Sequence, residues 1–429
     1  MLDIKLIREN PKIVEHNLRK RQQPEKVKIL EELIENDKKY RELLQELEDL
    51  KHKRNVLSKE IAQLKKDGKD ASSKMKEAAE TPEKIKKLED ETSNLMEKID
   101  YALMRIPNLL DESVPVGKDD SENVEIRSWG DPPKFDFEPK SHLEILEDLG
   151  LIDMESAAKV TGSAFYYLKN QLVLLDLAIQ RFAIEHLMKK GFQVFEPPLM
   201  INKRSYEGMI GDPYDFGEAS YKIEGEELYL IPTAEYPLGS IFTDKTFNKD
   251  ELPMRVCGVS ACFRKEVGTH GRYSKGLFRV HQFNKVEQFI FCLPEESWKF
   301  LEELQKNSEE LYQKLGLHYR VVANCSGDIS SKAAKAYDIE VWMADGNFRE
   351  SGSNSNCTDY QARRLNMKYR EKEGQAPVGF IHTLNNTALA TSRTMIAIIE
   401  QYQQKDGTVL IPKVLQPYMG GIKKLEKTK

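Results

Sequence analysis

The side chains best suited to chemistry lie in one stretch near the middle of the chain, residues 259–291. An apolar run ends in Arg264, Lys265 and Glu266, a loop with glycines follows, and a second strand-like run contains Phe283. Two such runs joined by a glycine-containing loop predict an antiparallel hairpin. If Arg264 and Glu266 lie on a strand, they point to the same face. An arginine there offers a planar fork for a carboxylate or phosphate. The alternative is a structural ion pair between the two residues.

Further segments extend this pattern. They are GFQVFEPPLM at 191–200, PTAE at 232–235 and HTLNNTALATSRTMIAIIEQYQ at 382–403. The first, the central stretch and the last resemble, in that order, motifs 1, 2 and 3 of class II aminoacyl-tRNA synthetases, and PTAE is a further point of resemblance. FRKE followed by VHQFNKVE is similar to the seryl-tRNA synthetase family in particular, of the common type that binds serine without zinc.

The resemblance implies a fold and a reaction. The fold is α+β, with an N-terminal antiparallel coiled-coil arm and a catalytic domain built on an antiparallel β-sheet flanked by helices. The reaction is serine–tRNA ligation: L-serine and ATP form seryl-adenylate and pyrophosphate, and serine is then transferred to the 3′ end of tRNA(Ser). Charging of tRNA(Sec) stays open. The resemblance also implies Mg²⁺, recognition of the long variable arm of the tRNA, and a homodimer formed through motif 1, in which Pro198 stands at the expected place.

Two arginines carry the implied catalytic roles. Arg264 matches the arginine that bridges the ATP α-phosphate and the amino-acid carboxylate, and Arg393 matches the one on the γ-phosphate. Viewed alone, Arg393 is equally compatible with a surface arginine at a helix start. Glu350 and Ser353 match the Mg²⁺ positions, and hard cations prefer such oxygen ligands. The other residues implied to contact ATP are Lys265, Glu266, Val280, Phe283, Ser351 and Gly352.

The serine pocket is assigned in three parts. Thr233, Ala234 and Glu235 would receive the ammonium, and Arg264 the carboxylate. The residues matched to the hydroxyl are Glu287, Asn385 and Thr387. Viewed alone, Glu287 is equally compatible with the solvent-facing side of a sheet. A pocket that pairs with the hydroxyl rejects alanine, because its polar groups would then be left unpaired.

Residues 26–106 predict an antiparallel helical hairpin. Two heptad seams are separated by a polar segment in which Gly68 and Pro82 act as breakers. The first seam is Leu43, Leu47, Leu50, Arg54, Leu57, Ile61 and Leu64; the second is Ile85, Leu88, Thr92, Leu95, Ile99, Ala102 and Ile106.

Positive charge is concentrated towards the predicted tip of this hairpin. Residues 51–76 carry a net charge of +6, whereas 25–50 and 77–100 each carry −4. The distribution favours contacts with RNA phosphates, although an ordinary solvated coiled-coil surface remains the alternative. The basic residues predicted to contact tRNA are Lys51, Lys53, Arg54, Lys59, Lys65 and Lys66.

Composition sets the remaining expectations. The 429 residues include 31% charged residues, and the net charge is only −5, so positive charge for RNA must be local. Five cysteines without a zinc or disulfide spacing predict a reducing, cytoplasmic location. No apolar run reaches the length of a membrane span, so no membrane partner is expected.

Composition places the domain boundaries, and the resemblance implies the role of each domain. Residues 1–106 are predicted to be a tRNA-binding domain, the proline-rich segment 107–140 a linker, and 141–429 the catalytic domain. Two other interpretations stay open. One is a carrier-protein aminoacyl ligase, a relative without the long arm; the other is a non-enzymatic, synthetase-like RNA-binding protein.

Overall fold

The structure is a computed structural model that describes residues 1–212, 220–266 and 276–427. The chain divides into two compact units. One contains Leu2–Arg19 and Gln23–Pro107, and the other contains Met1, Lys20–Gln22 and Asn108–Lys429.

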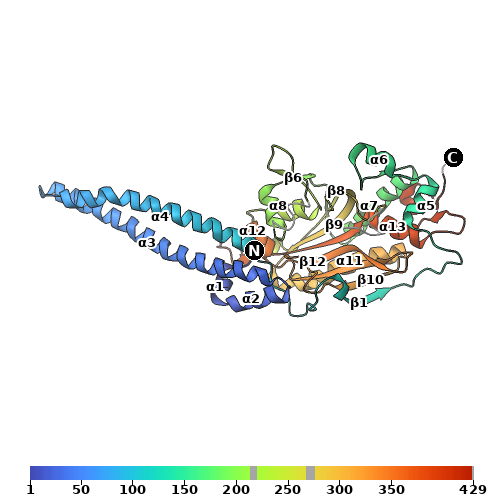
Figure 1. Ribbon diagram of the computed structural model, residues 1–429, viewed down its shortest axis with the longest axis horizontal. Coiled ribbons are helices and arrows are strands. Elements are labelled where there is room, and N and C mark those ends of the chain that lie inside the picture. The colour runs from blue at the N-terminus through green and yellow to red at the C-terminus, as the bar shows by residue number, and fades with distance from the viewer. Residues whose placement is uncertain (213–219, 267–275, 428–429) are drawn as a thin grey trace. The chain divides into compact units, whose positions relative to one another are not determined.

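The first unit is helical. Two short helices, α1 (Ile4–Glu9) and α2 (Pro11–Lys20), precede the long helices α3 (Val27–Lys66) and α4 (Ser72–Arg105). The long helices lie side by side as an antiparallel hairpin (Figure 1). At 1.5 Å per residue, the 40 residues of α3 span about 60 Å. The predicted coiled-coil arm is therefore confirmed.

The second predicted seam is buried at nearly every position, whereas the first is buried at Leu47 and Leu57 and partly buried at most of its other positions. Leu47 and Leu57 on α3 are 5% exposed, and Ile85 and Ile99 on α4 are 5% and 4% exposed. Arg54 is an error in the predicted seam, because its side chain is exposed. A guanidinium at that position gains more from hydration than its stem gains from packing.

The predicted break at Pro82 is wrong. Pro82 lies inside α4, and the turn between the long helices needs only a few residues around Gly68, whose φ is +69°. Thr81 Oγ1 donates a hydrogen bond to the carbonyl of Glu77 at 2.8 Å. Proline costs about 3 kcal/mol in a helix interior, and a long seam of buried contacts outweighs that cost.

The second unit is organised around an eight-stranded sheet. Its order is β1-β10-β11-β12-β15-β9-β8-β4, and neighbouring strands are antiparallel except β4 and β8. The strands are β1 (Val124–Trp129), β10 (Tyr319–Ala323), β11 (Lys335–Trp342), β12 (Phe348–Asn356), β15 (His382–Ala390), β9 (Gln282–Cys292), β8 (Met254–Phe263) and β4 (Gln193–Phe195). Strand β1 lies within the proline-rich segment that composition predicted to be irregular, and it closes one edge of the sheet by pairing with β10.

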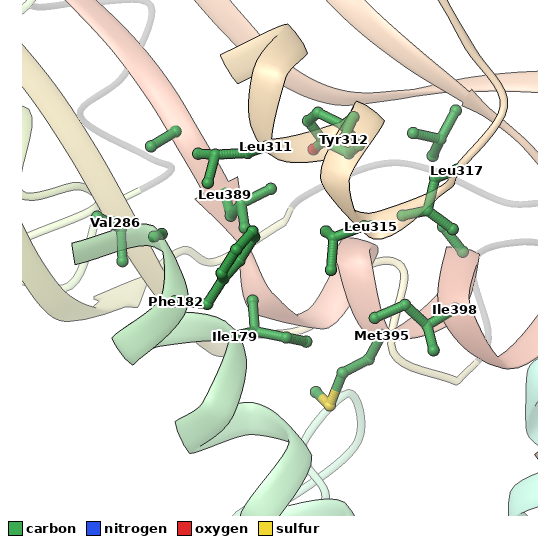
Figure 2. Packing of buried hydrophobic residues seen from close by; sticks show 14 of the residues in the cluster. Ile179, Phe182, Val286, Leu311, Tyr312, Leu315, Leu317, Leu389, Met395 and Ile398 are labelled. Carbon is green, nitrogen blue, oxygen red and sulfur yellow. The ribbon is translucent and has the colours of Figure 1, made fainter. Parts of the chain in front are cut away.

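Successive residues of β9 contact different apolar clusters because side chains alternate across a strand. Val286 and Ile290 belong to the larger cluster, which is packed by helices α5 (His142–Leu149), α7 (Gln171–Lys189), α11 (Ser297–Leu315) and α13 (Thr391–Gln401). Figure 2 shows part of this cluster, including Phe182 of α7 and Met395 of α13.

Phe289 and Phe291 belong to the second cluster. Helices α8 (Lys203–Met209), α10 (Glu235–Ser240) and α12 (Tyr360–Arg364) pack there. This face of β9 also carries the polar side chains described below. The remaining elements are β2 (Ile152–Asp153), α6 (Met154–Thr161), β3 (Tyr167–Leu168), β5 (Met200–Asn202), β6 (Leu228–Leu230), β7 (Thr246–Asn248), β13 (Lys368–Arg370), β14 (Gly379–Phe380), β16 (Val409–Leu410) and β17 (Lys424–Leu425).

Within the described parts of the chain, no helix is both long enough and apolar enough to span a membrane.

Candidate active site

The predicted central hairpin is formed by β8 and β9, which pair from Met254–Phe291 to Phe263–Gln282. Its connecting residues 267–275 lie outside the described part of the chain. The expectation that Arg264 and Glu266 share a strand face is wrong, because β8 ends at Phe263. Glu266 has a φ of +45°, a left-handed conformation that turns the chain out of the strand.

Arg264 and Glu266 have different partners. Glu266 pairs with Arg279 at 3.2 Å. Arg264 donates through Nε to the carbonyl of Pro232 at 3.3 Å, and its guanidinium carbon lies 5.3 Å from the centre of the Phe283 ring. Arg264 is thus oriented by a backbone carbonyl and an aromatic ring.

A cavity lies beside these residues at the ends of β9, β12 and β15. Eight of the residues implied to contact ATP line it, namely Arg264, Glu266, Val280, Phe283, Glu350, Ser351, Gly352 and Arg393. Lys265 instead points its ammonium at the Tyr221 ring, 5.8 Å from the ring centre. Ser353 faces Asp338 across the β11–β12 pair.

Arg393, the third residue of α13, is fixed in this cavity. Its Nη1 donates to the backbone carbonyl of Glu350 at 2.8 Å and lies 3.3 Å from Glu350 Oε2. Its guanidinium lies 4.8 Å from the centre of the Phe278 ring. Arg393 holds the pKa of Glu350 below its ordinary value, with further contributions from Arg264 and Lys285. Only 19% of the Arg393 side chain is exposed, so it is not a free surface arginine at a helix start.

Glu287 is fully buried, which rules out the solvent-facing alternative. Lys285 Nζ lies 2.5 Å from Glu287 Oε2. Thr387 Oγ1 donates to Oε2 at 3.4 Å, and Asn385 Nδ2 donates to Oε1 at 3.3 Å. The predicted hydroxyl-binding trio is therefore contiguous across β9 and β15.

Lys285 is a site residue that the sequence interpretation missed. It lines the same cavity and belongs to the strand face that carries Phe283 and Glu287. A signal was present, because a buried carboxylate requires a cation and Lys285 lies two residues before Glu287 on a strand.

A second cavity of about 350 Å³ adjoins the first. Arg264 and Glu266 line both cavities, so Arg264 stands between them. The other lining residues are Tyr206, Gly211, Ser220, Pro232, Thr233, Glu235, Tyr236, Ser330 and Lys332.

The PTAE segment presents Thr233 and Glu235 to this cavity, and the backbone N–H of Glu235 donates to Thr233 Oγ1 at 3.1 Å. Ala234 is fully buried in an apolar cluster instead. The segment lies close to β8 at Gly258, where a Cβ would come within 2.9 Å of the Ala234 Cβ.

Three oxygen-bearing side chains near the first cavity fit a hard cation. Asp338 on β11 is buried, and its Oδ1 has no hydrogen-bond partner among the described residues. Burial and the charge of Glu350 raise the pKa of Asp338 well above its usual value. A divalent cation shared by Asp338, Glu350 and Ser353 would relieve this repulsion. Asp338 was not predicted. Within the described ranges, no group of three or more His, Cys, Asp or Glu side chains is arranged to hold a metal, and the set here has two carboxylates and one hydroxyl.

Comparisons with known proteins agree with this geometry. Residues 1–110 match the seryl-tRNA synthetase N-terminal domain, and residues 219–402 match the class II tRNA synthetase core domain (G, H, P, S and T). The serine–tRNA ligase of Methanocella arvoryzae is 51% identical over 99% of this chain and 100% of its own length. The chain belongs to the seryl-tRNA synthetase family.

Solved structures of seryl-tRNA synthetases superimpose over the whole chain. The Pyrococcus horikoshii seryl-tRNA synthetase complexed with ATP has a TM-score of 0.94 and 46% identity, with 100% of both chains covered. The cytoplasmic serine–tRNA ligase of Naegleria fowleri in complex with AMP has a TM-score of 0.88 and 35% identity, covering 100% of this chain and 99% of that one.

The basic residues predicted on the synthetase arm fall into two groups. Lys51 pairs with Glu89 at 2.7 Å, and Lys53 pairs with Glu77 at 2.6 Å, across the two long helices. The side chains of the second group, Arg54, Lys59, Lys65 and Lys66, are exposed.

The motif 1 region forms an apolar groove. Helix α7 and the segment after β4 line it, together with Val259 of β8. The exposed fractions of Leu177, Met188 and Leu199 are 55%, 57% and 41%. Exposed apolar surface of this kind is typical of protein–protein contacts.

Proposed function

We propose that this protein is a serine–tRNA ligase that activates L-serine with ATP and transfers it to tRNA(Ser). The observation that carries the proposal is the position of Arg264, which lines both the cavity rich in implied ATP residues and the cavity that contains Thr233 and Glu235. A fork at that position can hold a carboxylate and a phosphate together.

The proposed activation step needs positioned charges. The serine carboxylate attacks the α-phosphate in line, the α–β phosphoanhydride bond breaks and pyrophosphate leaves. Arg264 holds both reacting groups, and Arg393 binds the γ-phosphate. Developing negative charge is stabilised by these fixed cations, so no general base is required. Mg²⁺ held by Asp338, Glu350 and Ser353 would neutralise phosphate charge when bound. The ring of Phe283 is available for stacking with adenine.

The serine side chain is proposed to bind beside Glu287. Its hydroxyl can donate to the carboxylate and accept from Thr387 or Asn385, which already contact Glu287. Alanine would leave these buried groups unpaired, at about 1–3 kcal/mol for each group. We therefore expect strong rejection of alanine, whereas threonine must be excluded by size.

Serine-dependent exchange of pyrophosphate into ATP tests the activation step. We expect exchange with L-serine, little with L-alanine, and serylation of a tRNA with a long variable arm. A non-enzymatic RNA-binding protein would give no exchange. A carrier-protein ligase would give exchange without serylation of tRNA. Either result would contradict the proposal.

For tRNA we propose that residues 1–106, with the coiled-coil arm, bind the long variable arm of tRNA(Ser), and that residues 141–429 perform the chemistry. The +6 charge of residues 51–76 supports phosphate contacts. Removing residues 32–100 and bridging the stem should preserve pyrophosphate exchange while reducing aminoacylation. Full tRNA affinity in that variant would refute the role of the arm.

We also propose a homodimer through the motif 1 groove. A second copy covering Leu177, Met188 and Leu199 would remove exposed apolar surface from water. A monomer mass in sedimentation at micromolar concentration would contradict this. All five cysteines are buried free thiols, which supports work in the cytoplasm, a reducing compartment.

A further inference from the structure

Lys332 places an ammonium group against Glu235 in the second cavity. Lys332 Nζ forms a close ion pair with Glu235 Oε1, and Gln361 Nε2 donates to the same oxygen at 3.1 Å. The side chains of Lys332 and Glu235 are only 12% and 5% exposed. Two donors thus converge on one oxygen of the carboxylate that is proposed to receive the serine ammonium.

The backbone that carries Lys332 is held in place, although it is neither helix nor strand. Asn108 Nδ2 donates to the backbone carbonyl of Lys332 at 3.0 Å, and the backbone N–H of Asn108 donates to the backbone carbonyl of Ser331 at 2.8 Å. Arg21 Nη2 donates to the carbonyl of Ala333 at 2.6 Å. These bonds fix the direction from which Lys332 approaches Glu235.

The charge of this pair favours a role in binding rather than in packing. A buried carboxylate without a cation tends to take up a proton and become neutral. Burial alone would lower the pKa of Lys332, but the Glu235 carboxylate outweighs it and raises that pKa above its ordinary value. Lys332 therefore stays charged beside the Glu235 carboxylate. Its ammonium also lies 5.6 Å from the centre of the Tyr236 ring, which lines the same cavity.

We propose that Lys332 is a positioning residue for the amino group of serine. It holds Glu235 through Oε1, so that Oε2 is presented to the substrate ammonium. This inference rests on the proposed serine activation, because it assigns a function to a neighbour of that pocket. Lys332 acts through Glu235 and does not itself touch the reacting atoms.

The test is the kinetics of Lys332→Met in the full-length protein, measured by pyrophosphate exchange. We expect the KM for serine to rise about tenfold or more, as for a lost charge-assisted hydrogen bond, while the KM for ATP changes less than about twofold. Lys332→Arg, which keeps the cation, should recover most of the affinity. The matched control is Lys335→Met three residues further on, at the start of β11, where the ammonium bonds to Ser113 Oγ at 2.8 Å; its KM for serine should stay unchanged.

A substrate analogue separates positioning from general damage to the site. L-Glycerate carries a hydroxyl in place of the serine ammonium, so it does not need an ionised partner. In the wild-type protein, the inhibition constant of L-glycerate should be well above the KM for serine. In Lys332→Met, the ratio of these two constants should fall towards one. An unchanged ratio, or equal rises in the KM for serine and ATP, would overturn the proposal.

A double-mutant cycle keeps the test decisive if the single variant fails to fold. Lys332→Met combined with Glu235→Gln leaves no unpaired buried charge. This double variant should have the same KM for serine as Glu235→Gln alone. A further rise would show that Lys332 does not act through Glu235. A fall in the KM of Lys332→Met would show that Lys332 competes with the substrate ammonium, and would also overturn the proposal. Absence of serine-dependent exchange in the wild-type protein would instead refute the proposed function.

Discussion

The catalytic cavities and the coiled-coil arm both contain paired charges, but the two regions differ in burial. Glu287 is fully buried and its partner Lys285 is 7% exposed on the side chain. In the arm, the side chains of Lys51 and Glu89 are 41% and 48% exposed. Buried pairs respond strongly to the loss of one partner, whereas exposed pairs are screened by water and salt. One substitution should therefore disable the catalytic site, while the arm should respond to the sum of several substitutions.

The largest expected effect is that of Arg264→Ala. Losing the fork that lines both cavities should cost about 3 kcal/mol or more in the transition state, and serine-dependent pyrophosphate exchange should become undetectable. Arg255→Ala is the matched control, because Arg255 lies on β8, the strand that leads directly into Arg264, and pairs with Glu303 at 2.9 Å. Pyrophosphate exchange at a near wild-type rate in Arg264→Ala would contradict the assignment of Arg264 to the active site.

The next largest effect concerns Glu287→Gln, which keeps the size of the side chain and removes the charge beside Lys285. We expect kcat/KM for serine to fall about thirtyfold, which corresponds to a loss of about 2 kcal/mol of transition-state stabilisation. The reason is that the uncharged amide no longer pairs with the buried Lys285 ammonium. The KM for ATP should change little. Glu340→Gln, whose carboxylate pairs with Arg320 at 2.6 Å, is the control. An equal loss in both variants would show general destabilisation instead.

The contrast in burial also explains which features were predictable from the sequence. Heptad spacing predicted the long helices because a period of 3.5 requires a buried seam. Alternation predicted β8 and β9, but the residue at which β8 ends depends on tertiary pairing. That is why the backbone of Glu266 and its contact with Arg279 were not anticipated.

The unpredicted site residues come from segments far apart in the sequence. Asp338 meets Glu350 only because β11 pairs with β12. Lys332 contacts Glu235 through the tertiary packing of an irregular segment. Such a segment lacks the repeating apolar spacing by which helices and strands are recognised in a sequence. Strand β1 alternates apolar and polar residues from Val124 to Arg127, but it is short, exposed along its length and set within a proline-rich segment, so its pairing with β10 was not anticipated.

In the arm, neutralising the exposed group Arg54, Lys59, Lys65 and Lys66 should weaken tRNA binding by about tenfold at moderate salt. Each phosphate contact that is lost should reduce the slope of log affinity against log salt by about 0.7–0.9. Filter binding of a long-variable-arm tRNA across a salt series measures both quantities. Pyrophosphate exchange should be unaffected. An arm that only docks another protein would leave tRNA affinity unchanged at every salt concentration.

The smallest effect is expected for Lys51→Gln combined with Lys53→Gln. Their ammonium groups already neutralise Glu89 and Glu77 on α4, and the hydrogen bond from Lys53 holds the pKa of Glu77 below its ordinary value. Since phosphate contacts would first have to break these pairs, tRNA affinity should change less than about twofold.

Glu77→Gln combined with Glu89→Gln provides the reciprocal experiment, because it releases both lysines while retaining their charge. If the pairs limit phosphate contact, this variant should bind tRNA more tightly and with a steeper salt dependence than the wild-type protein. The same filter-binding series is used, so the two variants differ only in which side of each pair is removed. A large loss of affinity in the double lysine variant would show that Lys51 and Lys53 contact RNA despite their partners, and that ion pairing does not separate the two groups of basic residues.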